Sequence, residues 1–353
     1  MRSEDIAKLA GVSRSTVSRV INNYPNVPEE TKAKVLKVIE EYHYEPNSFA
    51  RALAGKRTDT IGLFAISLSG KEQGNRIYQN NYFAPFVEAV VDTANAKGFY
   101  VLIHTVYSRE DFQKVKQAFL QKRIDGGILV GIQKDIEIVR ELVQLNAPLV
   151  IIDYDITEII AERLDKGHLA VINSKDYDGT VEAMEYLIGL GHRDIGMLCG
   201  ERNTYSGKER YTAYVDTMNK HGLPINDSYV LEGHFSKECA AAEMNKLIES
   251  GERPTAMFAA NDDMALSAIE VLHEHGISVP DEMAIIGFDD IDLASRTVPK
   301  LSSVKLPLYD MSKAAVQKII NMVGTTDLSF STLSLPAELM IRDSSGKSLP
   351  EKP

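Results

Sequence analysis

Hydrophobic and polar residues alternate with a helical period at the start of the chain, and this pattern gives way further along to short apolar runs. Apolar side chains recur every three or four residues in 4–10, 14–22 and 29–42, which predicts three short helices around a small core. Gly11 stands in the first turn, and Ser13 is placed to cap the second helix. This order is typical of a helix-turn-helix, although the spacing alone fits a generic three-helix bundle equally well.

The remainder of the chain alternates β-branched runs with helical stretches. The runs that read as buried strands are 61–66, 100–104, 127–130, 148–153, 169–172, 195–199, 256–260 and 283–288. Such alternation is typical of βαβ units and parallel sheets. Because the runs form two consecutive series, we expect an α/β domain of two lobes. Its cleft should lie at the carboxyl ends of the strands, where open α/β sheets bind ligands.

These patterns predict the domain organisation. The expected parts are a helix-turn-helix domain at 1–45, a hinge helix and linker at 46–58, a large α/β domain at 59–345 and a tail at 346–353. Within the large domain we expect an N-lobe of about 59–172 plus 291–324 and a C-lobe of about 173–290 plus 325–345. The hinge stretch 46–55 is too short to be stable as an isolated helix, so it needs a partner.

Composition describes a globular protein with an ample core, since 44% of the 353 residues are hydrophobic and 25% are charged. No apolar run is long enough for a membrane span and no leader opens the chain, so we expect a cytoplasmic protein. Cys199 and Cys239 have no metal-ligand spacing, which predicts reduced structural thiols. We expect neither a metal nor a cofactor.

The charge is unevenly distributed along the chain. The net charge is −11, yet residues 1–58 carry ten basic against seven acidic side chains, and the remaining residues carry 29 against 43. An acidic body would be repelled by phosphates unless a basic segment brought it to them. The asymmetry therefore points to a nucleic-acid-binding head.

The outward face of the second predicted helix favours DNA binding over a generic bundle. Val17 and Val20 face the core, and no carboxylate interrupts the helix. The side chains that point away can bond phosphates or base edges: Arg14, Ser15, Thr16, Ser18, Arg19 and Asn22.

Two stretches resemble the LacI/GalR family of bacterial transcription regulators. They are IAKLAGVSRSTVSRVIN, residues 6–22, and PNSFARAL, residues 46–53. The resemblance implies that Arg14 and Ser15 choose bases and that Arg19 reads a further base. It assigns the register on the phosphates to Ser13, Thr16, Ser18 and Asn22. In the hinge it implies that Leu53 enters the minor groove as an apolar wedge, with Asn47 and Arg51 near the backbone.

The likeness continues in the large domain, through Gly191-His192-Arg193, 261–265, Val279-Pro280 and 286–290. It implies an effector domain similar to periplasmic sugar-binding proteins, a homodimer and a pseudo-palindromic DNA operator. The residues it places around the effector are Tyr82, Phe83, Asp153, Arg210, Asn261 and Asp289. Carboxylate, amide and guanidinium groups suit a polyol, because each can pair with adjacent hydroxyls. As alternatives, Asn261 and Asp289 are helix or turn caps, and Tyr82 and Phe83 are ordinary lobe packing.

Motifs for catalysis are missing from the sequence. No G-x-G-x-x-G follows a predicted strand, and His273 and His275 are spaced so that they do not share a helix face. We therefore expect a non-enzyme: a DNA-binding repressor whose operator affinity is controlled by a sugar or related small molecule. The alternatives are control by a purine corepressor, control by a protein partner, and a sugar-modifying enzyme with a regulatory head. Because the chain has no Trp, stacking on a sugar would come from residues such as Phe83, Tyr154, Tyr205 or Phe288.

Overall fold

The computed structural model describes residues 1–21, 24–44, 57–66, 81–131, 136–325 and 329–346. The chain divides into two compact units, Met1–Thr58 and Asp59–Pro353. Within the described residues, no helix is both long and apolar enough to cross a membrane.

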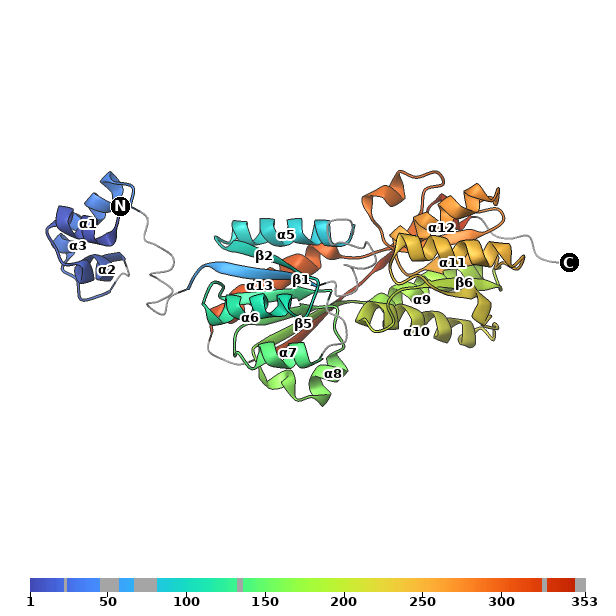
Figure 1. The fold of residues 1–353 in the computed structure, drawn as a ribbon, viewed down its shortest axis with the longest axis horizontal. Helices are drawn as coiled ribbons and strands as arrows, with labels where there is room; N and C mark the ends of the chain where they lie inside the picture. The colour runs from blue at the N-terminus through green and yellow to red at the C-terminus, as the bar shows by residue number, and fades with distance from the viewer. Residues whose placement is uncertain (22–23, 45–56, 67–80, 132–135, 326–328, 347–353) are drawn as a thin grey trace. The chain divides into compact units, whose positions relative to one another are not determined.

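The smaller unit contains the three predicted helices, α1 (Ser3–Ala10), α2 (Arg14–Ile21) and α3 (Glu29–Glu41) (Figure 1). Its core is formed by Ile6, Val17, Val20 and Val35, which are at most 4% exposed. Gly11 ends α1 with φ of 66°, the left-handed conformation that glycine adopts without strain, and this allows the sharp turn into α2. The apolar periodicity of this part of the sequence thus predicts its fold correctly.

Six strands form the first sheet of the larger unit: β1 (Thr60–Ile66), β2 (Tyr100–Val106), β3 (Gly126–Val130), β4 (Leu149–Ile152), β5 (Leu169–Ser174) and β11 (Phe330–Leu335). They lie in the order β11-β5-β4-β3-β1-β2, and all neighbours are parallel. The helices of this lobe are α5 (Phe83–Ala96), α6 (Asp111–Leu120), α7 (Ile136–Val143), α8 (Ile156–Ala161) and α13 (Leu308–Val323). Helices α5 and α13 share one apolar cluster with the sheet, while α6, α7 and α8 share a second.

The second sheet contains β6 (Ile195–Cys199), β7 (Val230–Glu232), β8 (Ala256–Ala259), β9 (Ala284–Asp289), β10 (Ser302–Lys305) and β12 (Glu338–Met340). The strand order is β12-β10-β9-β8-β6-β7, and only the β10–β12 pair is antiparallel. The helices of this lobe are α9 (Asp176–Gly189), α10 (Tyr205–Lys220), α11 (Lys237–Glu249) and α12 (Asp262–Glu274). Short 3-10 turns lie at Leu164–Lys166, Asp227–Tyr229, Asp292–Ser295 and Asp343–Ser345. The two-lobed α/β architecture with parallel sheets agrees with the prediction.

The predicted division of the lobes is wrong in its later part. Strand β10, placed in the N-lobe by the sequence, pairs with β9 in the second sheet, and β11, placed in the C-lobe, pairs with β5 in the first. The chain therefore crosses between lobes after β5, after β10 and after β11. These late strands are rich in serine and have no clear apolar run, so their sequence carries little information about which sheet they join.

The prediction that residues 100–104 form a buried strand is also wrong in one respect. The strand exists as β2, but Tyr100 is 74% and Ile103 45% exposed. The reason is its position, because β2 is the edge of its sheet and pairs only with β1. An apolar run alone does not distinguish an edge strand from a central one.

Candidate DNA-binding face and ligand cleft

The outward face of α2 carries the predicted DNA-contacting side chains. Val17 and Val20 are buried against α1 and α3, and this turns the other side of the helix to solvent. The exposed members of the predicted set are Ser13, Arg14, Ser15, Ser18 and Arg19, while Thr16 is half-buried. The remaining predicted DNA contacts, Asn22, Asn47, Arg51 and Leu53, lie outside the described residues.

The first turn of α2 is held by its serine cap. The Ser13 hydroxyl accepts a hydrogen bond from the Thr16 backbone N–H at 3.1 Å, as the sequence predicts. The same hydroxyl lies 2.7 Å from the Ser15 hydroxyl and 2.8 Å from that of Thr16. Arg14 forms a solvent-exposed ion pair with Glu4 of α1 at 3.4 Å. A pair of this kind is weak in water and leaves the guanidinium available to an incoming phosphate or base.

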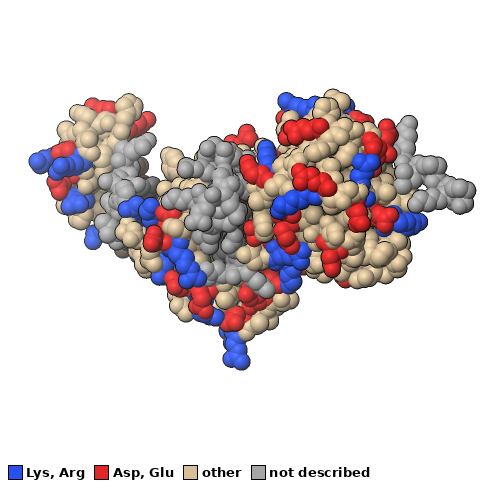
Figure 2. All heavy atoms as spheres, turned by 45° about the vertical axis from the view of Figure 1, so that its right-hand side comes forward, with Lys and Arg blue, Asp and Glu red and all other residues tan. Residues whose placement is uncertain are grey.

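The larger unit shows a different surface. On the face drawn in Figure 2, acidic and basic side chains alternate over this unit without a patch of one sign. This face therefore offers no continuous positive track for a nucleic-acid backbone. The charge distribution thus agrees with DNA contact through the smaller unit.

Several predicted ligand residues of the larger unit lie at the carboxyl ends of strands. Asp153 follows β4, Asp289 is the last residue of β9, and Asn261 comes two residues after β8. Arg210 lies in the middle of α10. Parallel sheets bring such positions to one edge, where open α/β folds bind ligands. The structure therefore brings residues that are distant in sequence into one polar cluster between the lobes.

Asp153 is held by donors from two directions. The Tyr82 hydroxyl donates to Oδ2 at 3.1 Å, and the Ser174 backbone N–H and hydroxyl lie 3.1 and 3.3 Å from Oδ1. Tyr82 packs against the apolar clusters of both lobes, so it bridges them. Asp153 also has a φ of 54°, an unfavourable conformation for a non-glycine residue. Strained residues of this kind gather at functional sites.

Arg210 is the central cation of the cluster. Its Nε donates to Asp176 at 2.8 Å, and its Nη1 donates to the Ala260 carbonyl and lies 3.6 Å from Asp289. The guanidinium carbon stands 3.7 Å from the centroid of the Phe288 ring. Because its side chain is only 4% exposed, these partners replace the water it gives up on burial.

Burial and like charges change the acidity of this cluster. Burial, together with the nearby Asp176 charge, raises the pKa of Asp153 from 3.8 to about 7. Burial also raises the pKa of Asp289 well above its ordinary value, although the Arg210 charge opposes the shift. The pKa of Tyr82 rises through burial and the Asp153 charge. The Asp153 carboxyl therefore titrates near neutral pH, so it can donate a hydrogen bond when protonated and accept one when ionised.

Asp289 lies in a turn that hydrogen bonds to a neighbouring carboxylate stabilise. Its φ is 109° and that of Asp290 is 55°. Buried Asp262 accepts hydrogen bonds from the Ile291 N–H at 2.9 Å and from the Ser303 hydroxyl at 2.6 Å. These bonds fix the turn that presents Asp289 to the cluster.

Two predicted ligand residues also have structural roles. The Asn261 side chain caps α12 by accepting from the Met264 N–H at 2.9 Å. The Phe83 ring is 8% exposed and belongs to the core of the first lobe, where it meets Tyr82 edge-on at 5.5 Å between centroids. Asn261 therefore does cap a helix, and Phe83 does pack within its lobe, as the alternative predictions for these two residues state.

Three residues of the cluster were missed by sequence reasoning. Ser174 is the last residue of β5, Asp176 comes two residues later, and both are fully buried. A search for polar residues after every predicted strand would have found them. Phe235 has a left-handed φ of 56° and lies with its ring 5.8 Å from the Arg210 guanidinium carbon, and no signal in the sequence marks it.

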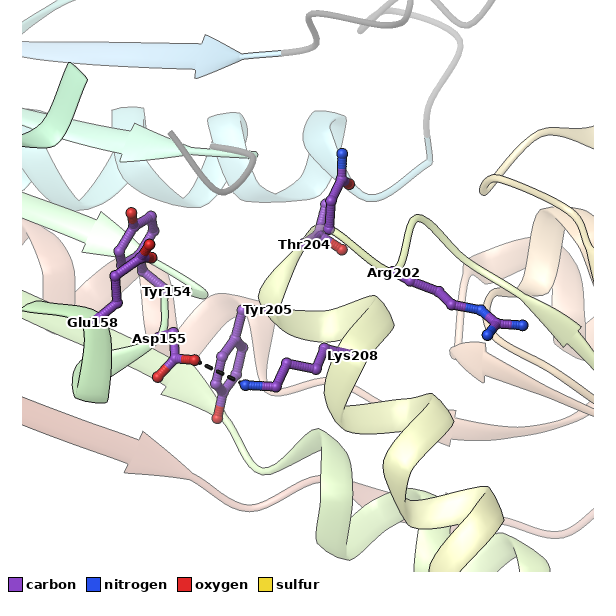
Figure 3. A pocket seen from close by; sticks show the side chains of 8 residues that line it. Tyr154, Asp155, Glu158, Arg202, Thr204, Tyr205 and Lys208 are labelled. Carbon is purple, nitrogen blue, oxygen red and sulfur yellow. Dashed lines mark hydrogen bonds and ion pairs between the residues drawn. The ribbon is translucent and has the colours of Figure 1, made fainter. Parts of the chain in front are cut away.

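A small pocket lies at the rim of the cleft, lined by Tyr154, Asp155, Glu158, Arg202, Asn203, Thr204, Tyr205 and Lys208 (Figure 3). Lys208 of α10 and Asp155, which caps α8, form an ion pair of 3.0 Å across the two lobes. On another side of the cleft, the Asn81 amide donates to Asp263 at 2.8 Å. The lobes are therefore joined by polar contacts around the central cluster. In the described part of the chain, no group of His, Cys, Asp and Glu side chains is arranged to hold a metal.

Both units are similar to known protein families. A family model described as "Bacterial regulatory proteins, lacI family" matches residues 4–47, and one described as "Periplasmic binding protein-like domain" matches residues 184–345. The "Probable HTH-type transcriptional repressor ExuR" of Bacillus subtilis (strain 168) is 33% identical over 343 residues, which are 97% of this chain and 97% of the relative.

Solved structures agree along the whole chain. A lac repressor dimer bound to operator and the anti-inducer ONPF has a TM-score of 0.79 and 26% identity, and the match covers 98% of this chain and 99% of that one. A complex of the transcriptional regulator CelR with cellobiose has a TM-score of 0.73 and 26% identity, with the same coverage.

Proposed function

The chain belongs to the LacI family of bacterial regulatory proteins and is a DNA-binding transcriptional repressor, and we propose that a sugar bound in the cleft of its larger unit controls its affinity for the operator. The observation that carries this proposal is the cluster of Asp153, Arg210 and Asp289 between the lobes. Planar carboxylate and guanidinium groups can each pair with two neighbouring hydroxyls, which is the pattern a sugar ring offers.

The acidity of the cleft supports a polyol over an anionic ligand. Three carboxylates, Asp153, Asp176 and Asp289, surround the single guanidinium of Arg210, and Asp176 and Asp289 already pair with it. An added negative charge would meet these carboxylates in a dry environment. Hydroxyl groups meet no such penalty, because they donate to ionised carboxylates and accept from protonated ones.

For DNA recognition we propose that α2 enters the major groove. Arg14, Ser15 and Arg19 would read bases, and Ser13, Thr16 and Ser18 would contact phosphates. By likeness to the lac repressor, whose solved structure is a dimer on its operator, we propose a homodimer in the cytoplasm. A two-fold symmetric protein then requires a pseudo-palindromic operator.

The sugar assignment is tested by thermal shift. The full chain is heated with glucose, galactose, ribose, cellobiose, hypoxanthine or guanine in turn, because a ligand that binds only the folded state raises apparent stability by mass action. At one hundred times Kd the gain is about 2.7 kcal/mol, which corresponds to several degrees. The matched variant is Asp289→Asn, which keeps the size of the side chain and tolerates the positive φ.

We expect one of the sugars, referred to below as the panel sugar, to stabilise the wild type and not the variant. Stabilisation by a purine alone would contradict the sugar assignment and favour a purine corepressor. If neither class of compound binds, control by a protein partner is favoured, and turnover of the bound sugar would indicate an enzyme.

A further inference from the structure

A continuous chain of hydrogen bonds and ion pairs runs through the cleft from one lobe to the other. It passes from Asp153 through Ser174 and Asp176 to Arg210 and then to Asp289. We propose that Ser174 and Asp176 are positioning residues that hold Asp153 of the first lobe and Arg210 of the second in register, so that ligand contact with either one changes the geometry at the point where the chain crosses between the lobes. The effector role of this geometry rests on the function proposed above.

The link from Asp153 to Arg210 has two halves, which meet at a joint formed by Ser174 and Asp176. Ser174, the last residue of β5, approaches Asp153 with its backbone N–H and its hydroxyl, and the hydroxyl also donates to Asp176. Asp176, the first residue of α9, then accepts from Arg210 Nε at 2.8 Å. Only Lys175 separates Ser174 from Asp176 in the chain, so the joint coincides with the first crossing between the lobes.

The joint is tied to a second crossing. The Lys175 N–H donates to the carbonyl of Leu335 at 2.9 Å, and Leu335 is the last residue of β11 before the chain returns to the second lobe. A change in lobe angle about these two segments must alter the backbone torsions at Lys175. That alteration would move the Ser174 hydroxyl relative to Asp176.

The chemistry of the Ser174 hydroxyl makes the link sensitive to the state of Asp153. A hydroxyl has one proton, so it can donate to Asp176 or to Asp153 but not fully to both. When it donates to Asp176, Asp153 is best satisfied by carrying a proton or by gaining a donor from a ligand. Both Ser174 and Asp176 are 0% exposed, so water does not compete for the hydrogen bond between them.

Two variants test the proposal on the full chain. Ser174→Ala removes the shared hydroxyl. Asp176→Asn removes the negative charge of the carboxylate that accepts a hydrogen bond from Arg210. The control is Ser312→Ala, which removes a buried hydroxyl that donates to the Phe86 carbonyl at 3.3 Å in the first lobe and is not part of the chain from Asp153 to Asp289. Binding of the panel sugar is measured by calorimetry, and operator affinity is measured with and without saturating sugar.

The expected result is a roughly tenfold or greater loss of sugar affinity in Ser174→Ala and Asp176→Asn, with operator affinity in the absence of sugar unchanged. At saturating sugar, both variants should also change their operator affinity less than the wild type does, which a mere loss of one ligand contact would not cause. Ser312→Ala should match the wild type in all three measurements. Wild-type sugar affinity in Ser174→Ala would overturn the proposal, as would a change of operator affinity at saturation as large as that of the wild type.

A second measurement remains decisive if no sugar in the panel binds the wild type, a result that would count against the proposed function alone. The Asp153 carboxyl is titrated by ¹³C NMR in wild type and in Asp176→Asn. The pKa of about 7 in the wild type should fall toward the ordinary range when the Asp176 charge is removed. An unchanged titration would refute the link between the lobes.

Discussion

Replacing Asp153 by Asn should stabilise the protein above neutral pH while removing its response to sugar. The carboxyl of Asp153 has a pKa of about 7 in the folded protein, raised from 3.8 by burial and by the charge of Asp176. Between these two values the folded state holds a proton that the unfolded state has lost. The free energy of unfolding therefore falls as pH rises through this window, and above about pH 7 the full cost of the buried charge is present.

The size of the effect on the free energy of unfolding follows from the pH interval between the two pKa values of Asp153. Each pH unit within it costs about 1.4 kcal/mol, so the wild type loses about 3 kcal/mol between pH 5 and pH 8 through this one group. Asn resembles the protonated carboxyl and does not titrate, so Asp153→Asn avoids the loss. Asp262 and Asp289 also titrate in the folded state, but they do so in both proteins and largely cancel in the difference.

The assay is thermal unfolding of wild type and Asp153→Asn from pH 5 to pH 8. The difference in Tm should be smaller at pH 5 and grow with pH by roughly 5 to 10 °C in favour of the variant. Asp111→Asn is a control whose Tm difference should not change with pH in this range, because the Asp111 carboxyl is ionised in both the folded and the unfolded state. Burial would raise the pKa of Asp111, but hydrogen bonds from the Tyr107 N–H and Ser108 outweigh it and lower that pKa. A Tm difference for Asp153→Asn that does not depend on pH would refute the reasoning.

Three further predictions concern the other parts of the chain. Arg14→Ala should weaken specific operator binding by about 1 to 3 kcal/mol and relax the choice at one base pair, measured by fluorescence anisotropy on operators varied one position at a time. Leu53→Ala, in the segment that resembles the family hinge, should lower operator affinity with sugar affinity unchanged, since its wedge role concerns the minor groove alone. Phe86→Ala, which empties a fully buried site beside Tyr82, should cost about 3 to 5 kcal/mol of stability and lower the Tm at neutral pH, as calorimetry would record.

The sequence predicts the smaller unit and most of the larger one because their cores repeat with clear periods. Burial of Val17 and Val20 determines which face of α2 is exposed to solvent. Each central strand, such as β4, is a short continuous apolar run. The later strands β10 and β11 were assigned to the wrong lobes because their residues are mostly small and polar. Their place depends on hydrogen bonds with β9 and β5, which local sequence does not express.

The polar cluster between the lobes was predicted in part, while its ligand-binding role stays a proposal. Asp153, Arg210 and Asp289 come together as the family resemblance implies, since each follows or faces the end of a strand. Asp176 was missed because its role is defined by its contact with Arg210, 34 residues away in the chain. Long-range pairing of this kind depends on how helices α9 and α10 pack, which the periodicity of either helix does not determine.

Operator affinity measured during titration with the panel sugar shows whether the cleft of the larger unit controls DNA binding. Labelled operator is bound by wild type and by Asp289→Asn, and anisotropy is followed as the sugar is added. We expect both proteins to bind the operator equally without sugar and only the wild type to change its affinity when sugar is added. An Asp289→Asn variant that responds to sugar at the wild-type concentration would contradict control through this cleft.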